Sequence, residues 1–298
     1  MKLLKCLFTA SDCYRAGRVI RPRGVMVHST GANNPNLRRY VQPVDSTPGR
    51  NKLLAQLGTN LNQNHWNQPR VYVYTDGTKT VWARDRNKKL KQVLYEPCVH
   101  AFIGKLVDGS VAAVQTLPWN FQGWHCGSGK KGSGNDTHIS FEICEDGLTD
   151  PAYFQQAYQT AVELTAMLCK EYGLDPLADG VVICHQDGYK QGIASNHGDV
   201  YNWFPKHGKT MDDFRADVAR VMAGGPADQT EEDDDMITYK TLNDVPAGFR
   251  PTIKKLMERG ALAGEADPDP TRLDDNILNV SYDYCRVMTT LDRMGKLE

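Results

Sequence analysis

Two short apolar runs, each leading into a histidine, constrain the fold of this chain more than any other feature. Residues 25–27 (Val-Met-Val) precede His28, and residues 181–184 (Val-Val-Ile-Cys) precede His185. Short runs rich in β-branched residues are typical of buried strands. If both strands belong to one sheet, both imidazoles lie where that sheet opens into loops. With Asp199 close behind, the pattern indicates a metal site of two histidines and one carboxylate.

Strand patterns alternate with helical patterns through residues 1–222. The clearest helix covers residues 152–172, where apolar side chains fall on one face and Gly173 follows as a stop signal. The alternation predicts an α/β domain with a mixed central β-sheet flanked by helices. The other expected elements are strands at 98–107, 110–115 and 137–144 and a helix at 211–222.

A change of composition separates this domain from the rest of the chain. Residues 223–235 contain no large apolar residue and carry six acidic ones, which is typical of a flexible linker. Residues 236–298 again show helical periodicity, at 246–260 and 278–295. We expect them to form a separate small helical module.

Composition narrows the partners and the compartment. A formal net charge of −1 gives no reason to expect nucleic acid or an anionic membrane as a partner, and no apolar run is long enough to insert into a membrane. The eight cysteines form no CxxC pair, so we expect free thiols and a reducing compartment. Lys5 and Asp12 interrupt any signal-peptide core, which predicts synthesis in the cytoplasm without a signal peptide.

Other chemically capable residues occur along the first domain. His100 belongs to an apolar run and is expected at a strand end, and His125 stands beside Trp124 in a Gly-Trp-His-Cys-Gly turn. Glu142 lies within the strand expected at 137–144, where burial of a carboxylate is costly without a cation, a metal or a catalytic role. From spacing alone, both a metal site and a set of unrelated structural histidines are consistent with this pattern.

The order of these motifs resembles a known family. The motifs are His28-Ser-Thr, Gly-Trp-His125-Cys-Gly, Asn135 followed by His-Ile-Ser-Phe-Glu142, and His185 followed by Asn-His197-Gly-Asp199. In this order, over roughly residues 20–220, they resemble the type 2 N-acetylmuramoyl-L-alanine amidases. That family includes phage endolysins and shares its fold with peptidoglycan recognition proteins.

The resemblance implies one zinc ion in an open groove. By position, His28, His185 and Asp199 match the family's metal ligands, and Glu142 matches the residue that acts on the attacking water. Relatives usually carry a lysine two residues before the third ligand, where this chain has His197. His197 is therefore the expected oxyanion partner, with a role as third ligand in place of Asp199 as the alternative.

The resemblance also suggests residues that contact the substrate or shape its groove. These are Trp124, His125, Asn135 and His100, and for His100 a packing role is equally open. The expected reaction is hydrolysis of the bond between N-acetylmuramic acid and L-alanine in bacterial peptidoglycan. Two imidazoles and a carboxylate leave a fourth zinc position for water, whose pKa zinc lowers to roughly 7. The alternatives are a non-catalytic peptidoglycan-binding module and a zinc hydrolase acting on another amide.

The wider biology is inferred from the same resemblance. A lytic enzyme without a signal peptide fits a phage or prophage endolysin, which leaves the cytoplasm through a holin pore and then acts on the cell wall. The alternative is a bacterial autolysin with another export route. Residues 236–298 resemble small modules that follow such amidases. Cell-wall attachment and formation of a homodimer are the two roles that we consider for them.

Overall fold

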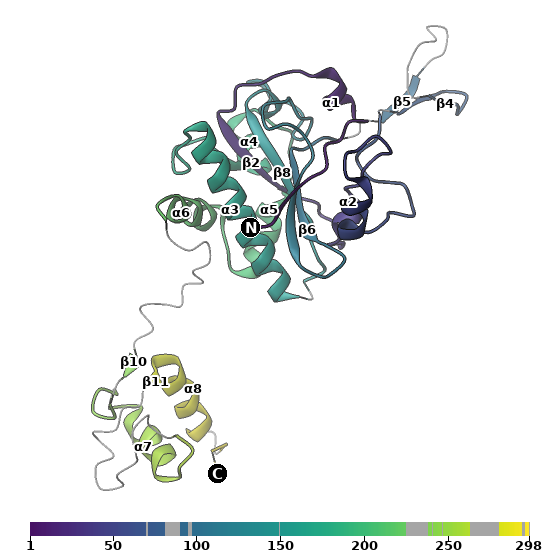
Figure 1. Ribbon diagram of the computed structural model, residues 1–298. Helices are drawn as coiled ribbons and strands as arrows, with labels where there is room; N and C mark the ends of the chain where they lie inside the picture. The colour runs from purple at the N-terminus through teal and green to yellow at the C-terminus, as the bar shows by residue number, and fades with distance from the viewer. Residues whose placement is uncertain are drawn as a thin grey trace. The chain divides into compact units, whose positions relative to one another are not determined.

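The computed structural model describes residues 1–69, 71–80, 90–94, 97–148, 150–224, 238–239, 241–245, 247–262, 280–293 and 296–297. The chain divides into two compact units, Met1–Asp228 and Gln229–Glu298, which are treated separately below (Figure 1). The linker predicted at 223–235 lies almost entirely outside the described residues.

A mixed six-stranded sheet forms the centre of the first unit (Figure 1), which confirms the predicted fold class. The strand order is β1-β7-β6-β8-β2-β9. Strands β6 and β7 are antiparallel, and the other neighbouring pairs are parallel. The strands are β1 (Leu3–Lys5), β2 (Gly24–Ser29), β6 (Ala101–Lys105), β7 (Val111–Gln115), β8 (His138–Ile143) and β9 (Val182–Cys184).

Alternation of side chains along β2 gives the sheet two different faces. Val25 and Val27 pack into a core shared with helices α3 (Pro151–Tyr172) and α6 (Met211–Met222). Because successive strand residues point to opposite faces, Met26 and His28 lie on the other face. Glu142 of β8 is the register partner of His28, so both side chains share that face. The site is therefore built on the side of the sheet that α3 does not cover.

The second face is only partly covered. Helix α2 (Arg50–Leu57) and the 3-10 turn η1 (Leu37–Arg39) pack there against β6 through Phe102. Figure 1 shows α2 and α3 on opposite sides of the sheet. The loops that carry the site therefore lie at the ends of β2 and β9.

The long helix α3 has the boundaries that the sequence predicted. Its first residue is Pro151, Asp150 caps it by accepting a hydrogen bond from the backbone nitrogen of Tyr153 at 3.0 Å, and it ends at Gly173 with φ of 65°. Helix α6 begins after Thr210 with a capping box, also as predicted. Three short helices were not predicted: α1 (Asp12–Ala16), α4 (His185–Gln191) and α5 (Val200–Trp203).

The remaining elements of this unit are short. A separate antiparallel sheet contains β3 (Val71–Tyr74), β4 (Lys79–Thr80) and β5 (Leu90–Leu94), and two further 3-10 turns are η2 (Gly134–Asp136) and η3 (Phe204–His207). All eight cysteines of the chain are free thiols, and seven are buried. Within the described residues, no helix has the length and apolar character needed to cross a bilayer.

Among its described residues, the second unit has two helices and one pair of strands. Helices α7 (Arg250–Glu258) and α8 (Tyr282–Arg293) enclose a small core that includes Ile253 and Cys285. Strands β10 (Thr238–Tyr239) and β11 (Val280–Ser281) pair antiparallel. The described part of the module is therefore mainly helical, with a short two-stranded addition.

Candidate metal centre

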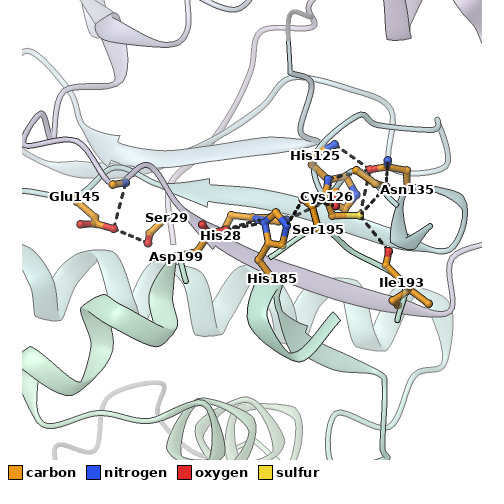
Figure 2. A network of polar contacts seen from close by, with 12 residues as sticks. His28, Ser29, His125, Cys126, Asn135, Glu145, His185, Ile193, Ser195 and Asp199 are labelled. Atoms are coloured by element: carbon orange, nitrogen blue, oxygen red, sulfur yellow. Dashed lines mark hydrogen bonds and ion pairs between the residues drawn. The ribbon is translucent and has the colours of Figure 1, made fainter. Parts of the chain in front are cut away.

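Three side chains from separate parts of the first unit converge at the open end of the sheet (Figure 2). Oδ2 of Asp199 lies 2.7 Å from Nδ1 of His28 and 3.1 Å from Nδ1 of His185. The two Nδ1 atoms lie 3.2 Å apart. Both imidazoles are almost fully buried, with 1% and 4% of their surface exposed. The structure thus brings together the three residues that the sequence suggested as ligands.

His185 is held in place by the start of a helix. The sequence suggested a loop after β9, but His185 is the first residue of α4. Asp187 accepts a hydrogen bond from the backbone nitrogen of Cys184 at 3.3 Å, which fixes this first turn. Arg215 of α6 donates to Asp187 at 2.6 Å and to the carbonyl oxygen of Val182 at 2.7 Å. The strand end and the helix start are therefore clamped by one guanidinium.

Asp199 has an unusual backbone. Its φ is +47° and its ψ is −132°, a conformation that non-glycine residues rarely adopt and that costs on the order of 1–3 kcal/mol. The following helix α5 is anchored in the core by Val200 and Trp203, which are 0% and 1% exposed. This anchoring maintains the strained conformation that turns the carboxylate toward the histidines.

The second nitrogen of each histidine has its own partner. Nε2 of His28 lies 3.0 Å from Nδ1 of His125, and Nε2 of His185 lies 3.3 Å from Oγ of Ser195. Ser195 donates its hydroxyl proton to the carbonyl oxygen of Cys126 at 3.2 Å, so its oxygen can accept a proton from His185. Outer partners of this kind fix ring orientation in metal-binding histidines and leave the inner nitrogen free to coordinate.

The turn that carries His125 is built by Asn135. The side-chain oxygen of Asn135 accepts from the backbone nitrogens of His125 at 2.8 Å and Cys126 at 3.2 Å. Its amide nitrogen donates to the carbonyl oxygen of Gly127 at 3.0 Å (Figure 2 shows these residues). Asn135 is 1% exposed, so it supports the turn from within, whereas Trp124 is 42% exposed and accessible to a ligand.

His100 lies apart from the metal ligands. It lies directly before the first residue of β6 and therefore does not end a strand. The pairing of β6 with β8 places it level with Ser140. The backbone nitrogen of Ser140 donates to Nδ1 at 3.0 Å, so Nε2 carries the proton and donates to the carbonyl oxygen of Phe121 at 2.6 Å. His100 is fully buried with both nitrogens engaged. This geometry favours the packing role over substrate contact.

Glu142 places one unpartnered carboxylate oxygen beside the cluster. Its Oε2 is buried and has no hydrogen-bond partner among the described residues. Burial, followed by the negative charges of Asp199 and Glu145, raises the pKa of Glu142 well above its usual value. A buried group of this kind is costly unless a cation or a proton neutralises it.

His197 occupies a different position from Asp199. Its side chain is exposed, and its ring centroid lies 4.8 Å from that of His185. The group of residues whose ligand atoms converge contains His28, His185 and Asp199 but not His197. Of the two alternatives from the sequence, the geometry favours Asp199 as the third ligand and leaves His197 at the rim.

The protonation states suit a divalent cation. Burial lowers the pKa of His28 below its usual value despite the opposing effect of Asp199, so the imidazole is neutral near pH 7. Burial opposes the charge of Asp199, but the polar contacts with His185 and His28 hold the pKa of that carboxyl below its usual range. Neutral imidazoles and an ionised carboxylate are the forms that coordinate zinc.

The residues present fit a zinc ion. Tetrahedral ligands about 2.1 Å from zinc lie about 3.4 Å from one another, whereas the three ligand atoms here are separated by 2.7–3.2 Å. Side-chain shifts of a few tenths of an ångström would therefore admit the ion. The orphaned oxygen of Glu142 is a second sign that positive charge belongs here.

Sequence reasoning missed two features of the site. Ser195 lies ten residues beyond His185, and nothing in its surroundings indicated the hydrogen bond. Glu145 accepts from the hydroxyl of Ser29 at 2.6 Å and from the backbone nitrogen of Gly31 at 3.2 Å, and so braces the loop after β2. A carboxylate just after a predicted strand, as at Glu145, is the one signal that could have drawn attention to this brace.

Comparison with known proteins identifies the family. The family model described as N-acetylmuramoyl-L-alanine amidase matches residues 18–202, which is more than half of the chain. The chain therefore belongs to the N-acetylmuramoyl-L-alanine amidase family, as the order of its motifs predicted. Among curated proteins, none matches the sequence.

Several solved structures are similar to the first unit. Staphylococcus aureus hydrolase AmiA, in complex with its ligand, is 17% identical with a TM-score of 0.46, and the match covers 75% of this chain and 86% of AmiA. PlyL is 17% identical with a TM-score of 0.42, covering 73% of this chain and 97% of PlyL. The catalytic domain of PlyG is 18% identical with a TM-score of 0.43, covering 78% of this chain and 99% of that domain.

Proposed function

We propose that this chain is a zinc-dependent N-acetylmuramoyl-L-alanine amidase that cleaves the bond between N-acetylmuramic acid and L-alanine and so lyses bacterial cell walls, as an endolysin does. One observation carries the proposal: the ligand atoms of His28, His185 and Asp199 converge beside Glu142, whose Oε2 is buried and without a hydrogen-bond partner among the described residues, in a chain of this family. A non-catalytic module needs neither the ligand set nor the buried carboxylate.

The reaction divides among a few side chains. His28, His185 and Asp199 would hold the zinc ion, which when bound supplies Lewis-acid chemistry that polarises the scissile carbonyl and acidifies a water. Glu142 takes a proton from the attacking water and passes it to the leaving amine of L-alanine. His197, exposed beside His185, donates to the negative oxygen of the tetrahedral intermediate.

The experiment combines metal analysis with a defined substrate. Zinc content is measured on the wild type, Asp199→Ala and His197→Ala, and a synthetic muramoyl peptide is digested and its products weighed by mass spectrometry. We expect about one zinc per chain in the wild type and in His197→Ala, but not in Asp199→Ala. The wild type alone should release N-acetylmuramic acid and the intact peptide at full rate.

Each other outcome has a definite meaning. Loss of zinc in His197→Ala in place of Asp199→Ala would reassign the third ligand and leave the amidase proposal intact. Cleavage at a different amide bond would make the protein another zinc hydrolase. A wild-type protein that binds walls but releases no product is the non-catalytic module, and the proposal would be withdrawn.

For the second unit we propose either attachment to the cell wall or formation of a homodimer. Its small core, with Ile253 and Cys285 fully buried, supports an independent folded module. Light scattering of the full chain gives the mass in solution and tests the dimer directly. Sedimentation of the full chain with purified walls in the presence of chelator tests attachment without cleavage.

A further inference from the structure

A second concave site lies beside the metal ligands. A cavity of about 490 Å³ opens along the end of α4, between residues 128–131 and residues 189–195. Its lining includes three lysines, Lys130, Lys131 and Lys190, together with Tyr189 and Ser195. None of the residues assigned to the reaction above lines this cavity.

The two walls of this basic cleft are joined by backbone hydrogen bonds. The nitrogen of Lys131 donates to the carbonyl oxygen of Gly192 at 2.8 Å, and the nitrogen of Ser195 donates to that of Cys126 at 2.8 Å. Gly129 approaches Gly192 so closely that a Cβ at position 129 would lie 2.2 Å from its carbonyl oxygen. The basic cleft is therefore preformed, which lowers the entropic cost of binding a ligand.

The charge in the basic cleft is not neutralised by the protein. All three lysine side chains are exposed, and within the described residues none of them forms an ion pair with a carboxylate. Lys190 has only a cation–π contact, with its Nζ 4.7 Å from the ring centroid of Tyr201. The whole chain has a net charge of −1, so this is a local concentration of positive charge. Such a site suits an anion.

Ser195 connects the basic cleft to the metal ligands. It lines the cleft, and its Oγ lies 3.3 Å from Nε2 of His185. On the other side of the same imidazole, Nδ1 lies 3.1 Å from Oδ2 of Asp199. One imidazole ring thus separates the basic cleft from the proposed reaction centre.

We propose that the basic cleft binds carboxylate groups of the substrate's peptide, on the leaving-group side of the scissile bond. This rests on the proposed function, because a muramoyl peptide cleaved at the ligands would carry its peptide past them on the leaving-group side. An extended peptide advances about 3.5 Å per residue, so one or two residues beyond L-alanine span the width of the imidazole. The lysines then select a glutamyl residue with a free carboxylate over one whose carboxylate is amidated.

The test measures binding without cleavage. Isothermal titration of the zinc-loaded full chain uses two peptides, Ala-isoGlu-Lys and Ala-isoGln-Lys, which differ by one carboxylate and lack the scissile bond. The variants are Lys130→Ala with Lys131→Ala, Lys190→Ala, and Lys131→Arg as the charge-conserving change. Lys52→Ala, an exposed lysine of α2 outside the basic cleft, is the matched control.

We expect the wild type to bind the isoGlu peptide about threefold to tenfold more tightly than the isoGln peptide, the range for one or two ion pairs in a partly shielded site. The preference should disappear in the double alanine variant and fall in Lys190→Ala. It should persist in Lys131→Arg and Lys52→Ala. Equal affinity of the wild type for both peptides, or a preference that survives loss of the lysines, overturns the proposal.

Two further readouts separate this proposal from the others. If the protein cleaves a muramoyl peptide but binds the isoGlu and isoGln peptides equally, the amidase proposal stands and the proposal for the basic cleft is wrong. If the protein shows the lysine-dependent preference but cleaves no muramoyl peptide, the proposal for the basic cleft stands and the amidase proposal is wrong. If the lysine variants lose binding to poly(glycerol phosphate) but not to the isoGlu peptide, the cleft holds a phosphate polymer and the proposal is wrong.

Discussion

Nε2 of His28 lies 3.0 Å from Nδ1 of His125, so the first ligand is oriented by a second histidine. Burial and the neighbouring histidines lower the pKa of His125 well below its usual value, which keeps this ring neutral. Asn135 in turn holds the backbone of His125. The aromatic-glycine turn therefore supports the candidate metal centre from behind, and the substrate contact that the sequence suggested for this turn stays a prediction.

Replacing His125 by alanine should lower zinc affinity by about 10- to 100-fold, the usual effect of removing the outer partner of a ligand. His125→Asn places an amide oxygen near the position of Nδ1 and should recover part of the loss. Competition with a fluorescent chelator measures both affinities without reference to activity. Unchanged affinity in His125→Ala would show that His28 is oriented by its strand alone.

Replacing Glu142 by glutamine should lower kcat by about 10²- to 10⁴-fold, because an amide of the same shape cannot transfer the proton. Zinc content should stay the same, since Glu142 is not among the three converging ligands. Product release from a muramoyl peptide and metal analysis on one preparation check both expectations. An active Glu142→Gln variant would assign the proton transfer elsewhere.

His100 predicts a pH dependence of stability. Burial lowers its pKa from 6.5 to about 4 in the folded chain. Between these values the unfolded chain binds a proton that the folded chain does not, so stability is full above pH 6.5 and falls as the pH drops toward 4. The whole shift corresponds to about 3 kcal/mol.

His100→Asn should flatten this dependence. Its amide oxygen can still accept from the backbone nitrogen of Ser140, but the side chain does not titrate. Urea unfolding at several pH values, with chelator present, gives the slope of the unfolding free energy for each protein. We expect the variant's slope to be smaller by up to about 1.4 kcal/mol per pH unit. If the unfolding free energies of the two proteins change with pH to the same extent, His100 is not the cause of this pH dependence.

Local sequence pattern was enough to predict the frame of the fold. The apolar run before His28 and the one-sided periodicity of residues 152–172 each specify an element, and these elements appear as β2 and α3. Two histidines at the ends of neighbouring strands must lie near each other once the strands pair. That is why the convergence of His28 and His185 could be expected without a structure.

Contacts between distant loops could not be predicted in this way. His125 is 97 residues from His28, and the turn that carries it is shaped by Asn135 and not by a strand register. Likewise, α4 begins at His185 because Asp187 and Arg215 clamp its first turn, and this depends on the packing of α6. Such side-chain partners leave no periodic trace in the sequence.

Arg215 provides a test of whether this clamp matters to the metal centre. Its guanidinium joins Asp187 of α4 to the carbonyl oxygen of Val182 in β9, on either side of His185. Arg215→Ala should lower the unfolding free energy by about 1–3 kcal/mol, because it breaks hydrogen bonds to a charged group. It should also lower zinc affinity by about tenfold, since His185 loses its fixed direction.

Arg220→Ala is the matched control for this substitution. Arg220 lies on the same helix and pairs with Asp217, which is not one of the candidate metal ligands. It should lose comparable stability while keeping wild-type zinc affinity. Chemical unfolding and chelator competition on both variants separate the two effects. If both variants lose zinc affinity in proportion to stability, then the clamp acts only through the fold, and His185 needs no dedicated support.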